Sequence, residues 1–175
     1  LGENGAGKST LMKILSGFYS PDRGAILLDG EEVAVESPAD AIRHGIGMLH
    51  QDPLDFPPLT VLDDFILGSP GGPLLGRKKS RKRFAELSAR FGFELDGEAF
   101  VDSLTVGERQ QLEILRLLSL GAQVLILDEP TTGISLPQKE KLFATLKKLS
   151  QEGMSVLFVS HKLEDVESLC DGAVV

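Results

Sequence analysis

Short apolar runs alternate along this chain with stretches in which apolar residues recur every three or four positions. The unbroken apolar run at residues 124–127 is typical of a strand buried on both faces, and the run at residues 155–159 is similar. Further strands are expected at residues 25–28 and 46–49. The helical spacing covers residues 7–15, 138–150 and 163–169. This order predicts an α/β fold with a mainly parallel sheet.

Turn and capping residues mark several boundaries of these elements. Asp29 followed by Gly30 is a hairpin signal directly after the strand expected at residues 25–28. Ser37 followed by Pro38 predicts the N-cap and first position of a helix, and Gly45 predicts its end.

The middle of the chain lacks the alternation of strands and helices. Residues 52–120 look helical, so we expect a helical subdomain inserted between core segments 1–51 and 121–175 of a single domain. A glycine- and proline-rich loop at residues 68–73 precedes a basic run at residues 77–83. The basic run is interpreted as a solvated helix start, which could lie near anionic lipid headgroups, rather than as a nucleic-acid patch.

Composition and charge narrow the function classes. The 175 residues carry a formal net charge of −8, which argues against sequence-independent binding of nucleic acid. The single cysteine, Cys170, excludes an intrachain disulfide, disfavours a zinc cage and fits a reducing compartment. No apolar run is long enough to cross a bilayer, so work at a membrane would require a partner.

The chain begins with a match to the phosphate-loop pattern G-x-x-x-x-G-K-[ST] at residues 2–9. Glycines let backbone N–H groups converge on phosphate oxygens, and the helix that follows points its positive end at the anion. Lys8 would reach the β- and γ-phosphates, and Ser9 would ligate Mg²⁺. The predicted nucleotide-binding residues here are Gly2, Glu3, Asn4, Gly5, Ala6, Gly7, Lys8, Ser9 and Thr10. The alternative is a glycine-rich turn that merely caps a helix.

Two acids, Asp128 and Glu129, follow the buried run at residues 124–127. Asp128 is expected to hold Mg²⁺ through its water shell. Glu129 would point elsewhere and orient or deprotonate the attacking water. Pro130 is expected to keep Glu129 extended, because a residue before proline avoids helical geometry.

Residues 104–108, Leu-Thr-Val-Gly-Glu, resemble the LSGGQ signature of ABC ATPases, which are P-loop NTPases. Thr105 and Glu108 also form a capping box, so this segment can be read as a well-capped helix start and nothing more. The resemblance implies that Thr105, Val106, Gly107 and Glu108 contact ATP held by a second ATPase domain in a head-to-tail dimer.

The resemblance also implies functional roles for two single residues. Gln51 follows the strand at residues 46–49 and resembles the Q-loop glutamine that senses Mg²⁺ and water; His161 resembles the switch histidine that contacts the γ-phosphate. The family usually has an aspartate where Ser135 stands, and that aspartate helps to pair the two nucleotide sites. Ser135 and Gln138 keep a capping box there.

Within the family, the sequence of residues 2–17, 45–51 and 160–163 resembles that of the first ATPase half of simple-sugar and nucleoside importers. The resemblance implies Mg-ATP hydrolysis, a membrane permease, indirect work with an extracellular solute-binding protein, and a place on the cytoplasmic face of the membrane. Alternatives are a non-transport ABC ATPase acting on ribosomes or DNA, and a module that binds nucleotide without hydrolysis.

Because the chain starts at Leu1, directly before the phosphate loop, and stops at Val175, we expect a fragment cut at both ends. It would lack the strand before the phosphate loop and the residue that stacks on adenine.

Overall fold

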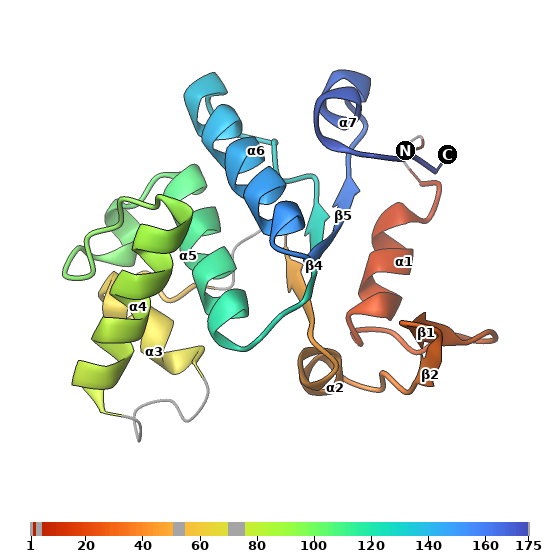
Figure 1. The fold of residues 1–175 in the computed structure, drawn as a ribbon, viewed down its shortest axis with the longest axis horizontal. Helices are drawn as coiled ribbons and strands as arrows, with labels where there is room; N and C mark the ends of the chain where they lie inside the picture. The colour runs from red at the N-terminus through yellow and green to blue at the C-terminus, as the bar shows by residue number, and fades with distance from the viewer. Residues whose placement is uncertain (1, 3–4, 51–54, 70–75, 175) are drawn as a thin grey trace.

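Three parallel strands form the centre of the computed structural model, which describes residues 2, 5–50, 55–69 and 76–174. They are β3 (Ile46–Leu49), β4 (Val124–Asp128) and β5 (Ser155–Val159), in the order β3-β4-β5 (Figure 1). In β4, Val124 pairs with Ile46 on one side and with Ser155 on the other, both in parallel register. The predicted parallel sheet is confirmed, and the three strand ranges agree with the sequence to within one residue.

Helices cover both faces of the central strand β4. Its side chains alternate: Leu125 and Leu127 belong to one apolar cluster, and Ile126 belongs to the other. This explains why the strand is an unbroken apolar run, since each face meets a different layer of helices. The helices are α1 (Lys8–Leu15) and α2 (Pro38–Arg43) beside Ile126, and α5 (Val106–Ser119) and α6 (Leu136–Gln151) beside Leu125 and Leu127.

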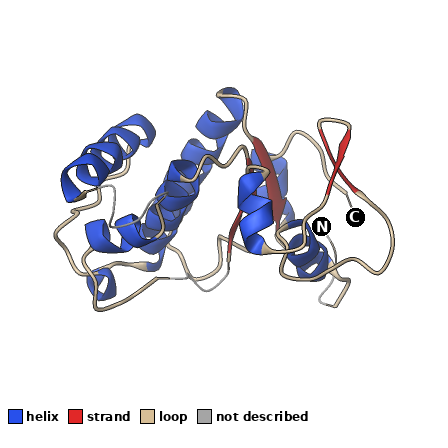
Figure 2. Cartoon of the chain, turned by 90° about the horizontal axis from the view of Figure 1, so that it is seen from below, coloured by secondary structure: helices blue, strands red, loops and turns tan. Residues whose placement is uncertain are grey.

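A small antiparallel hairpin lies at the end of the molecule away from the helical region (Figure 2). It consists of β1 (Ile26–Leu28) and β2 (Glu31–Val33), joined at Asp29 and Gly30, which both have positive φ (52° and 85°). Positive φ at both central residues matches the twist of a two-residue hairpin, so the predicted turn is confirmed. At the start of α2, the Ser37 side chain accepts a hydrogen bond from the Asp40 backbone N–H, as its capping role predicted.

In the described part of residues 52–120 the regular structure is helical apart from one β-bridge between Thr60 and Phe100, and loops connect the helices. The rings of Phe65 and Phe84 pack edge to face within its core, with their centroids 5.3 Å apart. Its elements are α3 (Val61–Leu67), α4 (Arg77–Phe91), the 3₁₀ turn Val101–Ser103 and α5. Their helical character matches the sequence, while the division into core and subdomain remains a prediction. Across the described residues, no helix has the length and apolar character needed to span a membrane.

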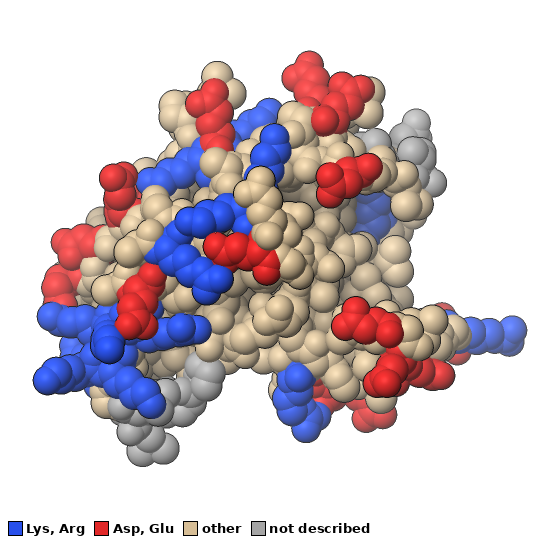
Figure 3. Space-filling model, viewed as in Figure 1, with Lys and Arg blue, Asp and Glu red and all other residues tan. Residues whose placement is uncertain are grey.

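The basic run forms the exposed first turns of α4, where lysines and arginines gather in Figure 3. Arg77 pairs with Asp63, and both Arg77 and Arg81 pair with Glu98. These acids neutralise part of the positive charge, which fits the interpretation of the run as a solvated helix start.

Strand β5 is less buried than its apolar run suggested. Leu157 is 37% exposed and Ser155 is exposed, whereas the expectation was burial similar to that of β4. The physical reason is position: β5 pairs with β4 on one side only within the described sheet, and a groove of about 1310 Å³ runs along it. That groove is lined by parts of α1, α6 and α7 (Leu163–Leu169) as well as by β5.

Two buried carboxyl groups, one on α3 and one on α5, share one arginine. Asp64 is fully buried and Glu113 is 7% exposed. The Arg116 guanidinium lies 2.7 Å from Glu113 Oε2 and 3.6 Å from Asp64 Oδ2. Burial raises the pKa of Asp64, and it raises the pKa of Glu113 to about 7, although Arg116 opposes both shifts. Gly68 makes room for the arginine, since a Cβ there would lie 2.3 Å from Arg116 Nε.

We expect Glu113→Gln to make the domain more stable than the wild type at pH 8. In the wild type the folded protein holds the Glu113 proton up to about pH 7, whereas the unfolded chain releases it near 4.5. The folded state therefore binds more protons between these values, and its stability falls as pH rises through that window. A shift from 4.5 to about 7, at about 1.4 kcal/mol per unit, sets an upper bound of about 3.5 kcal/mol.

Urea unfolding of the full-length protein at pH 5 and pH 8 measures this effect. The gain of the Gln variant should be largest at pH 8 and much smaller at pH 5, near the lower end of the window, where the wild-type side chain is protonated in the fold. The exposed Glu140 provides a control, because Glu140→Gln removes a carboxylate without touching the buried pair. A Glu113→Gln variant that is destabilised equally at both pH values would contradict the assignment.

Candidate functional site

The phosphate-loop residues lie at the start of α1 with the backbone geometry that the motif requires. Gly5 and Gly7 have φ of 88° and 87°, in the left-handed region that favours glycine. Gly7 is the N-cap of α1, and no side chain caps the helix there. A Cβ at either glycine would meet open space, so the backbone conformation rather than crowding accounts for the glycines.

Lys8 is the first residue of α1 and folds back over the loop, where its Nζ donates to the Gly2 carbonyl at 2.6 Å. Ser9 and Thr10 follow it and are exposed. Two other predicted loop residues, Glu3 and Asn4, lie outside the described residues. The arrangement offers an anion an ammonium group and an uncapped helix N-terminus, which together favour phosphate.

Asp128 ends β4 and is almost completely buried, at 8% exposure. Its Oδ1 has no hydrogen-bond partner among the described residues. A buried carboxylate oxygen without a partner is costly, and a cation or its coordinated water would satisfy it. No group of three or more His, Cys, Asp or Glu side chains gathers as a metal cage within the described ranges. An ion of the Mg²⁺ type, held by one carboxylate and substrate phosphates, fits this donor set.

The strand β3 ends beside Asp128. Burial and Lys13 lower the pKa of His50, the residue after β3, and the charge of Asp128 opposes that shift. Gln51, predicted as a metal and catalytic residue, comes next in the chain and lies outside the described residues. Because Leu49 pairs with Leu127 in the sheet, the end of β3 is held next to the acidic pair.

Glu129 departs from its predicted conformation. It has φ of 49°, in the left-handed region, whereas Pro130 was expected to keep it extended. Its backbone N–H still donates to the Val159 carbonyl at 3.0 Å, and its own carbonyl accepts from the Thr132 N–H at 3.1 Å. A tight turn therefore begins directly at the strand end. Proline disfavours only the right-handed helical region at the residue before it, and the left-handed region remains open. Such strain in a non-glycine residue costs about 1–3 kcal/mol and is typical of functional sites.

The turn brings Glu129 against His161, the residue that follows Ser160 after β5. His161 Nδ1 lies 3.2 Å from Glu129 Oε1, and the His161 side chain is about half exposed. Two residues that are 32 positions apart are thus joined at the edge of the sheet where β4 and β5 end. A carboxylate held by an imidazole beside a second, buried carboxylate is suited to acid–base chemistry on a water molecule.

Three further polar side chains hold this turn in place, and none of them was predicted as part of the site. Gln110 of α5 donates to the Pro130 carbonyl at 2.8 Å. Thr131 donates to the buried Asp165 of α7 at 2.7 Å, and Asp165 also pairs with Lys139 of α6. These contacts join residues 20 to 34 positions apart, so no local pattern in the sequence could indicate them.

The signature-like segment forms the N-terminus of α5. Thr105 and Glu108 form the predicted capping box, in which the Thr105 hydroxyl accepts from the Glu108 backbone N–H and the Glu108 carboxylate accepts from the Thr105 N–H. Thr105 and Val106 are exposed, whereas Gly107 is buried. Helices α5 and α1 lie on opposite sides of β4 (Figure 1). The structure therefore brings together Asp128, Glu129 and His161, and it leaves the signature-like segment apart from α1.

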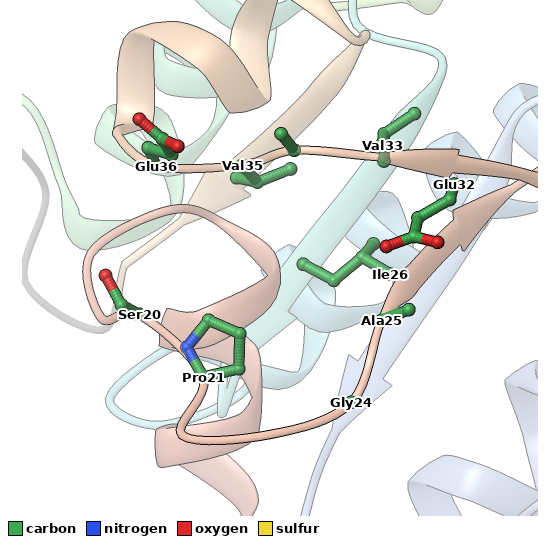
Figure 4. A pocket seen from close by; sticks show the side chains of 10 residues that line it. Ser20, Pro21, Gly24, Ala25, Ile26, Glu32, Val33, Val35 and Glu36 are labelled. Carbon is green, nitrogen blue, oxygen red and sulfur yellow. The ribbon is translucent and has the colours of Figure 1, made fainter.

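A hollow of about 520 Å³ beside the hairpin does not suit a phosphate (Figure 4). Val33, Val35 and Ile26 contribute apolar surface to it, and the charged residues of its lining are Glu32 and Glu36. Two carboxylates would repel an anion, so this hollow is not a second candidate for the nucleotide.

Comparison with known proteins gives a consistent result. The family described as "ABC transporter" matches residues 1–132. The chain is 41% identical to a glucose import ATP-binding protein of Haloferax volcanii, covering all of this chain and 37% of that protein. It is 38% identical to a ribose import ATP-binding protein of Caldanaerobacter subterraneus and 40% identical to an arabinose import ATP-binding protein of Ralstonia nicotianae. All of this chain aligns with both, over 36% and 35% of their lengths. The chain thus spans about a third of these relatives.

Solved structures show the same fold. An ATP-binding cassette of an ABC transporter in its ADP conformation superposes with a TM-score of 0.82, at 24% identity, over 97% of this chain and 72% of that one. CbiO1 of Clostridium perfringens, part of an ABC transporter complex, gives a TM-score of 0.80 at 28% identity, over 98% of this chain and 69% of that one.

Proposed function

Because this chain belongs to the ABC transporter family, we propose that it binds and hydrolyses Mg-ATP to drive the uptake of a small sugar through a membrane permease. The observation that carries the proposal is the Glu129–His161 pair at 3.2 Å, beside a buried Asp128 oxygen that lacks a partner among the described residues. This pair supports hydrolysis rather than nucleotide binding alone.

Each residue of the site has a defined task in this proposal. The N-terminus of α1 and Lys8 bind the β- and γ-phosphates. Ser9, Asp128 and Gln51 hold Mg²⁺, which neutralises charge on the phosphates when it is bound. Glu129 accepts a proton from the attacking water, and His161 holds the Glu129 carboxylate and contacts the γ-phosphate. One carboxylate, Asp128, thus serves the metal, and the other, Glu129, which His161 contacts, serves the water.

The proposed working unit contains a second ATPase domain. Since α1 and α5 pack on opposite sides of β4, Thr105, Val106, Gly107 and Glu108 are better placed for the ATP of a partner than for the ATP of their own chain. The partner domain is either a second copy or a second half of the same chain. In a head-to-tail pair, each ATP would then lie between one phosphate loop and one signature segment.

The names of the relatives point to the class of cargo. They are glucose, ribose and arabinose import ATP-binding proteins, so a monosaccharide is the proposed solute. The chain would act at the cytoplasmic face of the membrane, bound to the permease, with an extracellular solute-binding protein acting indirectly. Nucleic acid is not a proposed partner, in keeping with the net charge of −8.

Sugar uptake by the reconstituted full-length protein tests this proposal. The protein, its permease and its solute-binding protein would be placed in vesicles, and ATP-dependent accumulation of labelled glucose, ribose and arabinose would be measured. We expect one of these sugars to accumulate and to stimulate ATP hydrolysis. ATP hydrolysis that responds to ribosomes or DNA, with none of the sugars transported, would instead support a non-transport ATPase.

A further inference from the structure

One side chain joins the starts of helices α5 and α6. Gln138 belongs to α6, where its Oε1 accepts hydrogen bonds from the Ser135 backbone N–H at 2.9 Å and from the Ser135 hydroxyl at 3.0 Å. The other end of the same amide, Nε2, donates to the Thr105 hydroxyl at 2.9 Å. The amide therefore caps its own helix with one atom and contacts the signature-like segment, 33 residues away, with the other.

The packing around Gln138 leaves little room at Gly107. A Cβ at Gly107 would lie 3.0 Å from the Gln138 side-chain atoms Cδ and Nε2, tighter than ordinary contacts. Gly107 has no positive φ, so what glycine provides here is room for the Gln138 side chain and not an unusual backbone conformation. The first turn of α5 thus rests directly on the Gln138 amide.

The contact also sets the direction of the Thr105 hydroxyl. A hydroxyl has two acceptor lone pairs and one donor hydrogen. The lone pairs of Thr105 Oγ1 accept from Gln138 Nε2 at 2.9 Å and from the Glu108 N–H at 3.3 Å. Its hydrogen is left to donate to the Glu108 carboxylate, whose Oε2 lies 2.7 Å away. With both lone pairs taken by N–H groups and its hydrogen donated to Glu108, the Thr105 hydroxyl is fixed at the N-terminus of α5.

We propose that Gln138 is a positioning residue for ATP hydrolysis: it holds the N-terminus of α5, with Thr105, and the loop before α6 as one unit. The inference rests on the proposed function, in which Thr105 faces ATP on the second ATPase domain. A helix N-terminus that is held in place stabilises a developing negative charge better, because its N–H groups need no reorganisation during the reaction. Ser135, through its share of the same amide, belongs to this unit.

The substitution Gln138→Glu removes the hydrogen bond from Gln138 to Thr105, here called the bridge, and keeps the cap of α6. The introduced carboxylate would still accept from the Ser135 N–H and so preserve the capping box of α6, but it has no amide hydrogen to donate to Thr105. Loss of one such hydrogen bond should lower kcat for ATP by roughly 2- to 10-fold. The KM for ATP should change less than about twofold, because the bridge does not touch the phosphate loop of its own chain, and the melting temperature should stay that of the wild type.

The experiment measures ATP hydrolysis by the full-length protein assembled with its permease, for the wild type, Gln138→Glu and Gln151→Glu. Gln151 lies at the far end of α6, so its variant repeats the chemical change without touching Thr105. A lowered kcat with unchanged KM and melting temperature in Gln138→Glu alone supports the inference. Unchanged kcat, or a fall in kcat that follows a fall in melting temperature, would overturn it and leave Gln138 as a helix cap. If the wild type itself hydrolysed no ATP, the proposed function would fail instead.

Discussion

Glu129→Gln is expected to reduce ATP turnover by the full-length protein by roughly a hundredfold or more while ATP still binds. The glutamine amide keeps the size of the carboxylate and can still contact His161, but it cannot accept a proton from the attacking water. Asp128 and the phosphate loop are left intact, so the nucleotide should remain bound and the ATP-bound dimer should accumulate. Phosphate release measures turnover, and size-exclusion chromatography with Mg-ATP measures the dimer.

Two controls make this result specific. Glu164→Gln removes an exposed carboxylate three residues after His161 and should leave turnover near that of the wild type. Thermal unfolding should show that Glu129→Gln is folded, since its left-handed turn is unchanged in length and hydrogen bonding. Turnover above about a tenth of the wild-type value would exclude Glu129 as the main catalytic carboxylate.

Lys8→Ala is expected to weaken ATP binding by roughly tenfold or more, because a hydrogen bond from a charged group is worth about 1.5–3 kcal/mol. Lys8 is the cation that the phosphate loop supplies, and its ammonium now donates to the Gly2 carbonyl, within reach of the loop that would hold the phosphates. Alanine removes this charge and favours helix formation, so α1 itself should persist.

Calorimetric titration with ATP measures the affinity of this variant. Lys13→Ala is the matched control: Lys13 lies on the same helix and contacts the Tyr19 ring at 5.6 Å, away from the phosphate loop. We expect the control to bind ATP as the wild type does. Equal affinities of the Lys8 variant and the wild type would contradict the assignment of residues 2–9 as a phosphate loop.

The features that the sequence indicated most clearly are those whose geometry depends on neighbours within a few residues. The hairpin at Asp29 and Gly30 and the cap at Ser37 formed as expected, since positive φ and side-chain capping are decided within four residues. The capping box of Thr105 and Glu108 is local in the same way. The phosphate-loop glycines also follow this rule, because their left-handed conformations are properties of the backbone itself.

Tertiary structure decided the features in which distant residues meet. The left-handed turn at Glu129 forms where its backbone pairs with Val159, and that pairing, together with the turn, brings His161 within 3.2 Å. The exposure of Leu157 follows from the place of β5 in the sheet, which an apolar run does not specify. Gln138 could be read from the sequence as a cap, but its second contact, with Thr105, exists only because two helices approach at Gly107. Local chemistry therefore determined which groups this chain offers to a nucleotide, and the packing of distant elements determined which of those groups meet.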